Sequence, residues 1–405
     1  MEYTKVKLGD ILTSISETIS KEQQTAIFLN TSDISEGKFL HKRSSVVKEL
    51  PGQAKKKIKN GDILFSEIRP KNKRYAVVDV SNPNDYVVST KLMVLRIKDP
   101  SKYYLQYIYQ QLISQKMLHQ INEIAESRSG TFPQITFDAI KNIELTPPPL
   151  EEQKRIADIF TVLDDKIELN NQMNQTLEEI ASLLYKRWFV DFEFPDDKGN
   201  PYKSSGGEMV DSELGMIPKG WEVKELGEFI TLINGYAFKS GSYSKDGNYK
   251  IITIKNVLDN KFITNSTNKI LEIPDNVIEN QKLKIGDVLI SLTGNVGRVC
   301  VVTEGECLLN QRVAKIISKI EVNKYYWRTF FNTEEIKIKM INISKGTAQS
   351  NLSTIEIMKI KILNSKEVTY NFSEKIKAIS KKKLQNEIMI LNIEMIKQKL
   401  LEELV

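Results

Sequence analysis

The sequence predicts an α+β fold, with two mixed α/β modules in a pseudo-twofold tandem repeat, separated by two long antiparallel coiled-coil helices. Three observations support this prediction. The chain has 405 residues, which exceeds one ordinary domain. Four sequence echoes recur in the same order in both halves. Two long segments, one after each module, carry apolar residues at helical spacing.

The composition is that of a globular protein, with 40% hydrophobic and 27% charged residues. No apolar run approaches the roughly 20 residues that cross a bilayer, and the N-terminal residues lack the pattern of a signal peptide. We therefore expect a cytoplasmic protein without a membrane partner. The net charge of +6 permits a polyanionic partner but does not by itself indicate one.

The cysteines and histidines predict neither disulfides nor a metal site. Cys300 and Cys307 are the only cysteines. A zinc site built from them with His41 and His119 would need ligands from distant segments with no short-spaced pair. We expect both cysteines to be facing strand residues.

The internal repeat consists of short strings that match between the halves at slowly drifting offsets. The clearest pair is IKNGDILFS at 58–66 and LKIGDVLIS at 283–291, with an offset of 225 residues from Gly61 to Gly286. The other pairs are 7–10 with 225–228, 89–91 with 310–312, and 129–131 with 345–347. Ordered echoes with drifting offsets indicate a duplication with loop insertions.

Each module is expected to contain short strands, turns and some helix. Gly-Asp marks a turn at Gly61-Asp62 and at Gly286-Asp287, and β-branched runs follow. Residues 103–126 instead show helical spacing of apolar residues. We interpret these Gly-Asp pairs as structural, and Trp188 and Trp221 as core residues.

A long helix is predicted after the first module. Pro147, Pro148 and Pro149 end the preceding strand, and Glu151 and Glu152 place negative charge where the helix dipole favours it. Along this helix, one face carries residues spaced by three and four positions, which we call the seam. Its residues are Ile156, Phe160, Leu163, Ile167, Asn170, Asn174, Leu177, Ala181, Leu184 and Trp188.

The same seam recurs 216 residues later, with two lysines intruding. Its residues are Phe372, Ile376, Ile379, Lys383, Asn386, Ile390, Ile393, Lys397, Leu400 and Leu404. One stripe alone would favour a helix lying on its own module, whereas two stripes in register favour pairing of the helices with each other. Asn170 and Asn386 occupy equivalent polar positions that can fix the register.

The helices then act as a ruler. A helix from Glu151 to about Phe189 is roughly 58 Å long at 1.5 Å per residue. On duplex DNA this length corresponds to a footprint of roughly 15 base pairs, with two half-sites and an untouched spacer. The sequence divides into a first module (1–148), a central long helix (149–193), a linker (194–215), a second module (216–366) and a C-terminal long helix (367–405).

The strings around the first helix resemble the specificity subunits of type I restriction-modification enzymes. They are PLEEQKRIA at 149–157, LDDKIELN at 163–170, KRWFVDFE at 186–193 and LGMIPKGW at 214–221. The resemblance covers the whole chain. The second helix departs from it, because VTYNF at 368–372 replaces the Pro-Leu-Glu-Glu-Gln opening.

The resemblance implies two target-recognition domains that read the halves of a bipartite, asymmetric site on double-stranded DNA. It also implies that the paired helices act as spacer and dock the modification subunits, two in number, as well as restriction subunits. The implied cofactors, S-adenosylmethionine, ATP and Mg, belong to those partners, and none is expected in this chain. The docking and spacer residues are the seam positions Ile156, Phe160, Leu163, Ile167, Asn170, Asn174, Leu177, Leu184, Ile376, Ile379, Asn386, Ile390, Ile393 and Leu400.

Catalytic motifs are missing from the sequence. Pro147-Pro148-Pro149-Leu150 cannot replace the Asn-Pro-Pro-aromatic methylation motif, and the glycines at 241–247 lack the Gly-Lys-Ser/Thr ending of a P-loop. The acidic run at 195–198 is interpreted as linker rather than as a nuclease site. A specificity subunit without catalysis is therefore the leading hypothesis. A protein-binding coiled-coil scaffold and a standalone methyltransferase or nuclease are the alternatives.

The candidate DNA contacts are basic and amide side chains near predicted loops, because cations bind phosphates and a few polar groups read base edges. In the first module they are Lys55, Lys56, Lys57, Lys59, Arg69, Lys71, Lys73, Arg74, Lys91, Arg128 and Gln134. In the second they are Thr293, Asn295, Arg298, Arg312, Lys345 and Gln349. The alternative for the lysine run is a solvated hairpin face. Because the two sets differ, the two modules should read different sequences.

Overall fold

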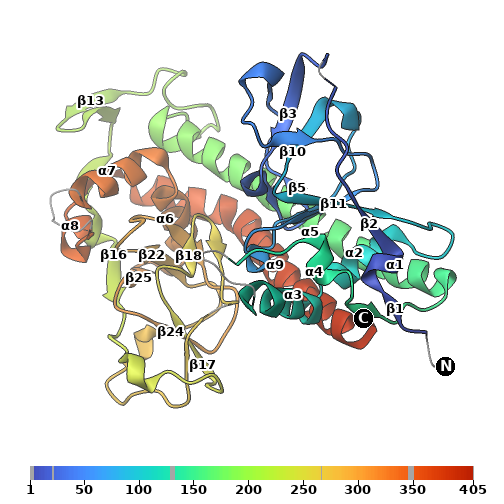
Figure 1. Ribbon diagram of the computed structural model, residues 1–405. Helices are drawn as coiled ribbons and strands as arrows, with labels where there is room; N and C mark the ends of the chain where they lie inside the picture. The colour runs from blue at the N-terminus through green and yellow to red at the C-terminus, as the bar shows by residue number, and fades with distance from the viewer. Residues whose placement is uncertain (1–3, 21, 128–132, 266, 345–350, 405) are drawn as a thin grey trace. The chain divides into compact units, whose positions relative to one another are not determined.

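The computed structural model describes residues 4–20, 22–127, 133–265, 267–344 and 351–404. Both modules are built on the same plan, with strands that follow one another in the same order and are joined into sheets in the same way (Figure 1). The predicted duplication is therefore confirmed.

The first module contains two four-stranded sheets. One has the order β2-β11-β8-β9 and is antiparallel throughout, and the other has the order β6-β3-β10-β7, in which β3 and β10 run parallel. Two antiparallel pairs complete it: β1 with β12, from the two ends of the module, and the hairpin of β4 with β5. The strands are β1 (Val6–Lys7), β2 (Leu12–Ile15), β3 (Thr25–Leu29), β4 (Ile34–Ser35), β5 (Lys38–Phe39), β6 (Ser44–Val46), β7 (Ala54–Lys56), β8 (Ile63–Ser66), β9 (Tyr75–Val77), β10 (Tyr86–Ser89), β11 (Leu92–Ile97) and β12 (Glu144–Leu145). The helices are α1 (Leu8–Ile11), α2 (Leu105–Ile113), α3 (Gln115–Ser127) and α4 (Phe137–Ile140).

The second module repeats this topology. Its sheets have the orders β16-β25-β22-β23 and β20-β17-β24-β21, again with one parallel pair, β17 with β24. The strands are β15 (Glu222–Glu225), β16 (Ile230–Asn234), β17 (Tyr249–Ile252), β18 (Val257–Leu258), β19 (Lys261–Phe262), β20 (Lys269–Ile270), β21 (Lys282–Leu283), β22 (Val288–Ser291), β23 (Val299–Val301), β24 (Cys307–Leu309), β25 (Val313–Ser318) and β26 (Lys361–Asn364). The helices are α6 (Lys324–Phe331), α7 (Glu334–Ser344) and α8 (Thr354–Met358).

The strongest sequence echo marks the same turn in both modules. Gly61 and Gly286 have φ values of 88° and 92°, a left-handed conformation that glycine adopts without steric cost. The aspartate that follows each glycine accepts a hydrogen bond from a backbone N–H three residues before it, at 2.7 Å for Asp62 and 2.8 Å for Asp287. Asp62 is also held by two hydrogen bonds from Arg96, at 2.7 and 2.9 Å. The structural role predicted for these turns is confirmed.

Two long helices follow the modules. They are α5 (Leu150–Tyr185), which continues into a π-helical turn η5 (Lys186–Val190), and α9 (Lys366–Leu404). Each compact unit of the chain combines one module with parts of both helices: residues 1–166 with 392–405, and residues 167–391. This division differs from the one drawn on the sequence, because each helix begins in one core and ends in the other.

In the first unit, Ile156 and Phe160 of α5 are buried in the module core, where Leu400 and Leu401 of α9 also pack. In the second unit, Phe372 of α9 enters the core together with Trp188 of the π-helical turn. Each seam therefore packs on its own module over its first turns. The alternative of a helix lying on its own module holds for these stretches.

Elsewhere the seam residues of α5 contact those of α9. In each unit the two helices run antiparallel. In the second unit, Asn386 donates to Asn174 at 2.9 Å and Lys383 contacts Glu178. In the first unit, Lys397 donates to Asp164 at 2.6 Å. The two lysines that interrupt the second seam therefore each meet a carboxylate from the other helix. The predicted register residue Asn386 pairs with Asn174 rather than with Asn170.

The segment predicted as a linker (194–215) is more ordered than its polar composition indicates. Phe194 is buried and its ring lies 5.3 Å from that of Trp221. The strands β13 (Met209–Ser212) and β14 (Gly215–Pro218) form a hairpin across the expected boundary. The strings that carry the family resemblance near Trp188 and Trp221 thus build an aromatic core, as predicted for both tryptophans.

Cys300 and Cys307 lie in β23 and β24 and belong to one buried cluster. Burial raises the pKa of Cys307 to about 12 and also raises that of Cys300. Both therefore behave as apolar core residues. Among the described helices, none has the length and apolar character needed to span a membrane.

Candidate nucleic-acid interface

Three segments that were separate candidates in the sequence meet at one edge of the first module. The loop from β8 to β9 begins at Glu67, whose N–H donates to the carbonyl of Lys91 at 3.0 Å. The carbonyl of Glu67 accepts from the N–H of Ile135 at 2.8 Å, and Ile68 forms a bridge with Gln134. The hairpin loop, the 89–91 segment and the residues after the Gly-Thr loop thus form one continuous surface.

The second module builds the same edge with equivalent hydrogen bonds. The N–H of Leu292 donates to the carbonyl of Arg312 at 3.0 Å, and its carbonyl accepts from Leu352 at 2.7 Å. Thr293 forms a bridge with Asn351, as Ile68 does with Gln134. We call these two surfaces the first and second recognition edges. They consist of residues 67–74, 91 and 133–135, and of residues 292–298, 312 and 351–352.

The two edges share a backbone path but not their residues. Arg69 and Lys73 have φ values of 47° and 54°, and the equivalent positions in the second edge are Gly294 and Gly297, at 71° and 78°. A left-handed conformation is unfavourable for a residue with a side chain, at a cost of roughly 1 kcal/mol or more each. The first edge therefore keeps two cations where glycine would be the conformationally easier choice.

The cations of the first edge are mostly open to solvent. Arg69, Lys71 and Lys73 are exposed, as is Gln134, whose amide donates to Glu67 at 3.2 Å. Arg74 is partly buried and donates to the hydroxyl of Thr31 at 3.3 Å. Lys91 is also partly buried. This edge can thus present several cationic donors to phosphates or base edges.

The second edge carries fewer charges and a more ordered arginine. Arg298 is partly exposed. The Asn295 amide is assigned with its oxygen facing Arg298, and this oxygen accepts from the two terminal guanidinium nitrogens at 2.9 and 3.2 Å. Arg312 is exposed. Thr293, by contrast, is only 7% exposed. Its hydroxyl was expected to contact DNA, but it does not reach the surface.

The predicted lysine cluster does not gather around the Gly61-Asp62 turn but is divided among β7, the turn before β8 and the loop after it, which is a correction. Lys55, Lys56, Lys57 and Lys59 precede the strand, whereas Arg69 to Arg74 follow it. Lys56 donates to the carbonyl of Leu92 at 2.8 Å, and burial lowers its pKa against the opposing effect of Glu67. Lys59 is exposed at the start of β8, in agreement with the alternative of a solvated face. Lys55 is also exposed, but it lies in β7, whose Ala54 pairs with Ser89 of β10 beside the first recognition edge.

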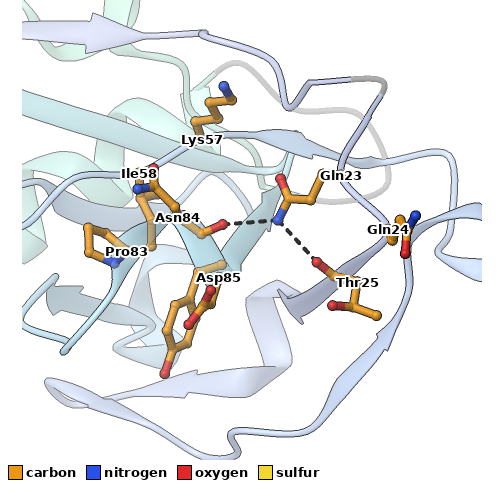
Figure 2. A pocket seen from close by; sticks show the side chains of 9 residues that line it. Gln23, Gln24, Thr25, Lys57, Ile58, Pro83, Asn84 and Asp85 are labelled. Atoms are coloured by element: carbon orange, nitrogen blue, oxygen red, sulfur yellow. Dashed lines mark hydrogen bonds between the residues drawn. The ribbon is translucent and has the colours of Figure 1, made fainter.

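Lys57 lines a separate pocket of about 420 Å³, shown in Figure 2. Its other walls come from the start of β3, from Asn84 and Asp85 before β10, and from Tyr86. Across it, the amide of Gln23 donates to the carbonyls of Asn84 and Thr25 at 2.9 and 3.2 Å. Its polar groups thus already bind one another, and the pocket is not part of the first recognition edge.

Arg128, Lys345 and Gln349 lie outside the described residues. Of the seam positions, Ile156, Phe160, Asn170, Asn174, Ile376, Asn386 and Ile393 are buried, and Leu163, Ile167, Leu177, Leu184, Ile379, Ile390 and Leu400 are partly buried. The seam is thus occupied by packing within the chain. In the part of the chain that the structure describes, no group of three metal-ligating side chains gathers.

Sequence reasoning missed the acidic turns beside both edges. Glu36 lies in the β4–β5 turn, 3.9 Å from Lys73, and Asp259 lies in the β18–β19 turn, 3.9 Å from Arg298. A fifth echo could have revealed them. ISEGKF at 34–39 matches VLDNKF at 257–262, with Lys-Phe identical at an offset of 223 residues.

Comparison with known proteins identifies the repeat. The family model for the type I restriction modification DNA specificity domain matches residues 1–179 and 218–388. The specificity subunit of the type I restriction enzyme HindI from Haemophilus influenzae is 35% identical, with 96% of this chain and 95% of that one covered. The MjaVIII specificity subunit of Methanocaldococcus jannaschii is 24% identical over 93% of this chain and 86% of its own.

A solved structure agrees in fold. The crystal structure of a type I restriction-modification system S subunit from M. genitalium has a TM-score of 0.55 and 15% sequence identity, with 99% of this chain and 96% of that one covered. The family model covers both repeats, and the HindI relative extends the match along almost the whole chain. The chain therefore belongs to the family of type I restriction-modification DNA specificity subunits, which are the non-catalytic, sequence-recognising components of those enzymes.

Proposed function

We propose that this chain reads a bipartite, asymmetric DNA site, with one half-site bound at each recognition edge. The observation that carries the proposal is the pair of edges. Equivalent backbone hydrogen bonds hold the same loop in both modules, while the exposed side chains differ. A conserved frame with different donors suits two different half-sites, because base edges are distinguished by the donors that reach them.

The charge of the first edge supports contact with phosphate and base edges. Arg69 and Lys73 keep strained backbone conformations, and such strain is typical of positions where the side chain serves a function. In the second edge, Asn295 accepts from both terminal nitrogens of Arg298, which restricts the positions that its guanidinium can take.

We further propose that α5 and α9 set the distance between the half-sites and dock the modification subunits, two in number, and restriction subunits. Because the seams are used within the chain, docking falls to apolar side chains that the helices leave exposed. In the first unit these are Ile159, Val162, Met395 and Ile396, and in the second they are Leu169, Ile180, Leu183, Tyr370 and Met389. Exposed apolar residues of this number on a helix are typical of a protein interface. In this proposal S-adenosylmethionine, ATP and Mg are bound by the partner subunits.

Two arginine variants test the assignment of the half-sites. We expect Arg298→Ala to weaken discrimination at the second half-site by roughly 5- to 150-fold, which corresponds to about 1–3 kcal/mol for a bidentate base contact. Arg69→Ala should act only on the first half-site. The measurement is competition binding of the complex with modification subunits, using duplexes changed in one half at a time.

Lys59→Ala is the matched control, because Lys59 is exposed but lies at the opposite end of β8 from the first edge. It should leave discrimination at both half-sites unchanged. Equal effects of each arginine variant on both half-sites would contradict the assignment. Absence of any salt-dependent binding to duplex DNA would instead favour a protein-binding scaffold.

Matched insertions test the spacer. Four residues added after Asn170 in α5 and four after Met389 in α9 fall between the Asp164–Lys397 and Asn174–Asn386 contacts on both helices. The insertions lengthen the pair of helices α5 and α9 by about 6 Å. The unspecified DNA segment between the two half-sites should therefore grow by about 2 base pairs. Both half-sites should stay the same when the methylated motif is sequenced. An unchanged spacer would rule out the helices as the ruler.

A further inference from the structure

The turn between β18 and β19 contacts three elements of the second unit. The N–H of Asn260 donates to the carbonyl of Val299 in β23 at 2.8 Å, and its side-chain oxygen accepts from Lys383 of α9 at 3.4 Å. Asp259, the preceding residue, lies against the second recognition edge and against α7. The backbone of the turn is thereby fixed to the sheet and to a spacer helix, which leaves the Asp259 carboxylate in a defined place.

Asp259 faces two cations. One carboxylate oxygen lies 3.0 Å from the ammonium of Lys337 in α7, and the other lies 3.9 Å from Nε of Arg298. The Asp259 side chain is 53% exposed, whereas those of Lys337 and Arg298 are 21% and 31% exposed. The carboxylate therefore lies on the solvent side of two cations that would otherwise repel each other.

Arg298 consequently has acceptors on two sides, one within hydrogen-bond distance and one at ion-pair distance. Asp259 faces its Nε, and the amide oxygen of Asn295 accepts from both of its terminal nitrogens. Its backbone N–H donates to the hydroxyl of Ser291 at 3.0 Å, which fixes the start of the side chain. An arginine without such partners samples many rotamers and binds phosphate as readily as a base.

We propose that Asp259 is a positioning residue for the second half-site, which holds Arg298 in place for a base edge and keeps it from binding phosphate nearby. This inference rests on the proposed function of the second recognition edge. Asp259 acts through Arg298 and repels phosphate by its own negative charge. It therefore lowers affinity for DNA in general while raising discrimination.

The first module has an acidic residue at the same place. The N–H of Glu36 donates to the carbonyl of Lys73 at 2.9 Å, and that of Gly37 donates to the carbonyl of Tyr75 at 2.8 Å, as Asn260 does to Val299. The Glu36 carboxylate lies 3.9 Å from the ammonium of Lys73. An acidic turn beside a cation of the recognition edge thus recurs in both copies, although the edges themselves differ.

The test uses the full chain in complex with its modification subunits and labelled duplexes. For Asp259→Asn we expect discrimination at the second half-site to fall about tenfold, within the range for one base contact. Affinity for a duplex without the site should rise several-fold. The slope of log affinity against log salt concentration should become steeper by the amount expected for about one additional phosphate contact. Discrimination at the first half-site should not change.

Two variants serve as controls. Asp259→Glu should restore discrimination because the charge is retained. Asp246→Asn removes the same charge from an exposed position on another loop of this unit and should change neither discrimination nor salt dependence. Opposite changes in affinity and discrimination distinguish positioning from a merely structural role, in which both would fall together with the thermal midpoint.

Arg298→Ala, measured in parallel, separates the two proposals. If Arg298→Ala loses discrimination at the second half-site and Asp259→Asn keeps it, the positioning role is overturned and the proposed interface stands. If neither variant affects that half-site, the second recognition edge is wrongly assigned and both proposals fail. Lower affinity of Asp259→Asn for every duplex alike would also overturn the positioning role.

Discussion

Replacing Phe372 by alanine is expected to lower the free energy of unfolding of the second unit by about 4 kcal/mol. The side chain of Phe372 is fully buried at 0% exposure, and its ring lies 5.2 Å from that of Phe189 and 5.7 Å from that of Trp188. Its removal leaves a cavity where the start of α9 meets the end of the other long helix. Edge-to-face ring contacts are lost in addition to buried area.

Tryptophan fluorescence during guanidinium unfolding measures this effect. All three tryptophans, Trp188, Trp221 and Trp327, belong to the core of the second unit, so the signal reports on that unit. The control is Tyr370→Ala, two residues earlier on the same helix and 49% exposed, which should change stability by about 0.5 kcal/mol or less. A Phe372→Ala loss no larger than that of the control would show that the aromatic core does not anchor α9.

Replacing Lys383 by alanine is expected to cost about 3 kcal/mol, the second largest effect. Lys383 is only 5% exposed, and its ammonium contacts Glu178 of α5 and the side chain of Asn260. Burial lowers its pKa, helped by the charge of Arg328 and opposed by Glu178. Removing the ammonium leaves the Glu178 carboxylate partly buried without its cation, which is the costly step in breaking a buried pair.

The double variant Lys383→Met with Glu178→Met is the matched control for this prediction. Replacing both members of a buried pair by apolar side chains is often neutral, so the double variant should be more stable than Lys383→Ala by about 2 kcal/mol or more. Guanidinium unfolding followed by tryptophan fluorescence compares the variants. Equal losses in both would mean that leaving the Glu178 carboxylate without its cation is not the main cost of Lys383→Ala.

The repeat could be predicted from the sequence because its strongest echo lies where the backbone restricts the choice of residue. Gly61 and Gly286 need a left-handed conformation, and the aspartates after them bind the same backbone group. Such positions keep their residue types when the surrounding loops change. The recognition edges diverge even at a left-handed position, where Arg69 in one copy corresponds to Gly294 in the other, so a shared backbone conformation alone does not fix the residue.

The partners of the seam residues could not be derived from periodicity alone. Lys383 and Lys397 only interrupt the apolar pattern in the sequence, and their carboxylate partners lie 205 and 233 residues away. The same holds for Asn386, which pairs with Asn174 although Asn170 is its counterpart in the repeat. A period fixes which face of a helix is apolar, but the pairing register also depends on how each helix packs on its module.

The candidate DNA contacts were predicted less well. Cations that are close in the sequence can lie at opposite ends of a strand, and the sequence alone does not show which end each of them occupies. Lys59 is close in sequence to Arg69, but the intervening strand β8 separates the two residues at its opposite ends. Lys55 lies in β7, beside Ser89. Thr293 is buried, and it forms a bridge with the distant residue Asn351, neither of which a local pattern indicates. The acidic turns at Glu36 and Asp259 were missed because a search for DNA contacts selects cations and amides, and a carboxylate is repelled by phosphate.

The most direct test of a bipartite specificity subunit is a motif-resolved methylome of the host with and without this gene. One adenine-methylated motif, made of two different half-sites and an unspecified spacer between them, should be present with the gene and disappear on its deletion. Restoring the gene should restore the motif. An unchanged set of adenine-methylated motifs after deletion would contradict the account.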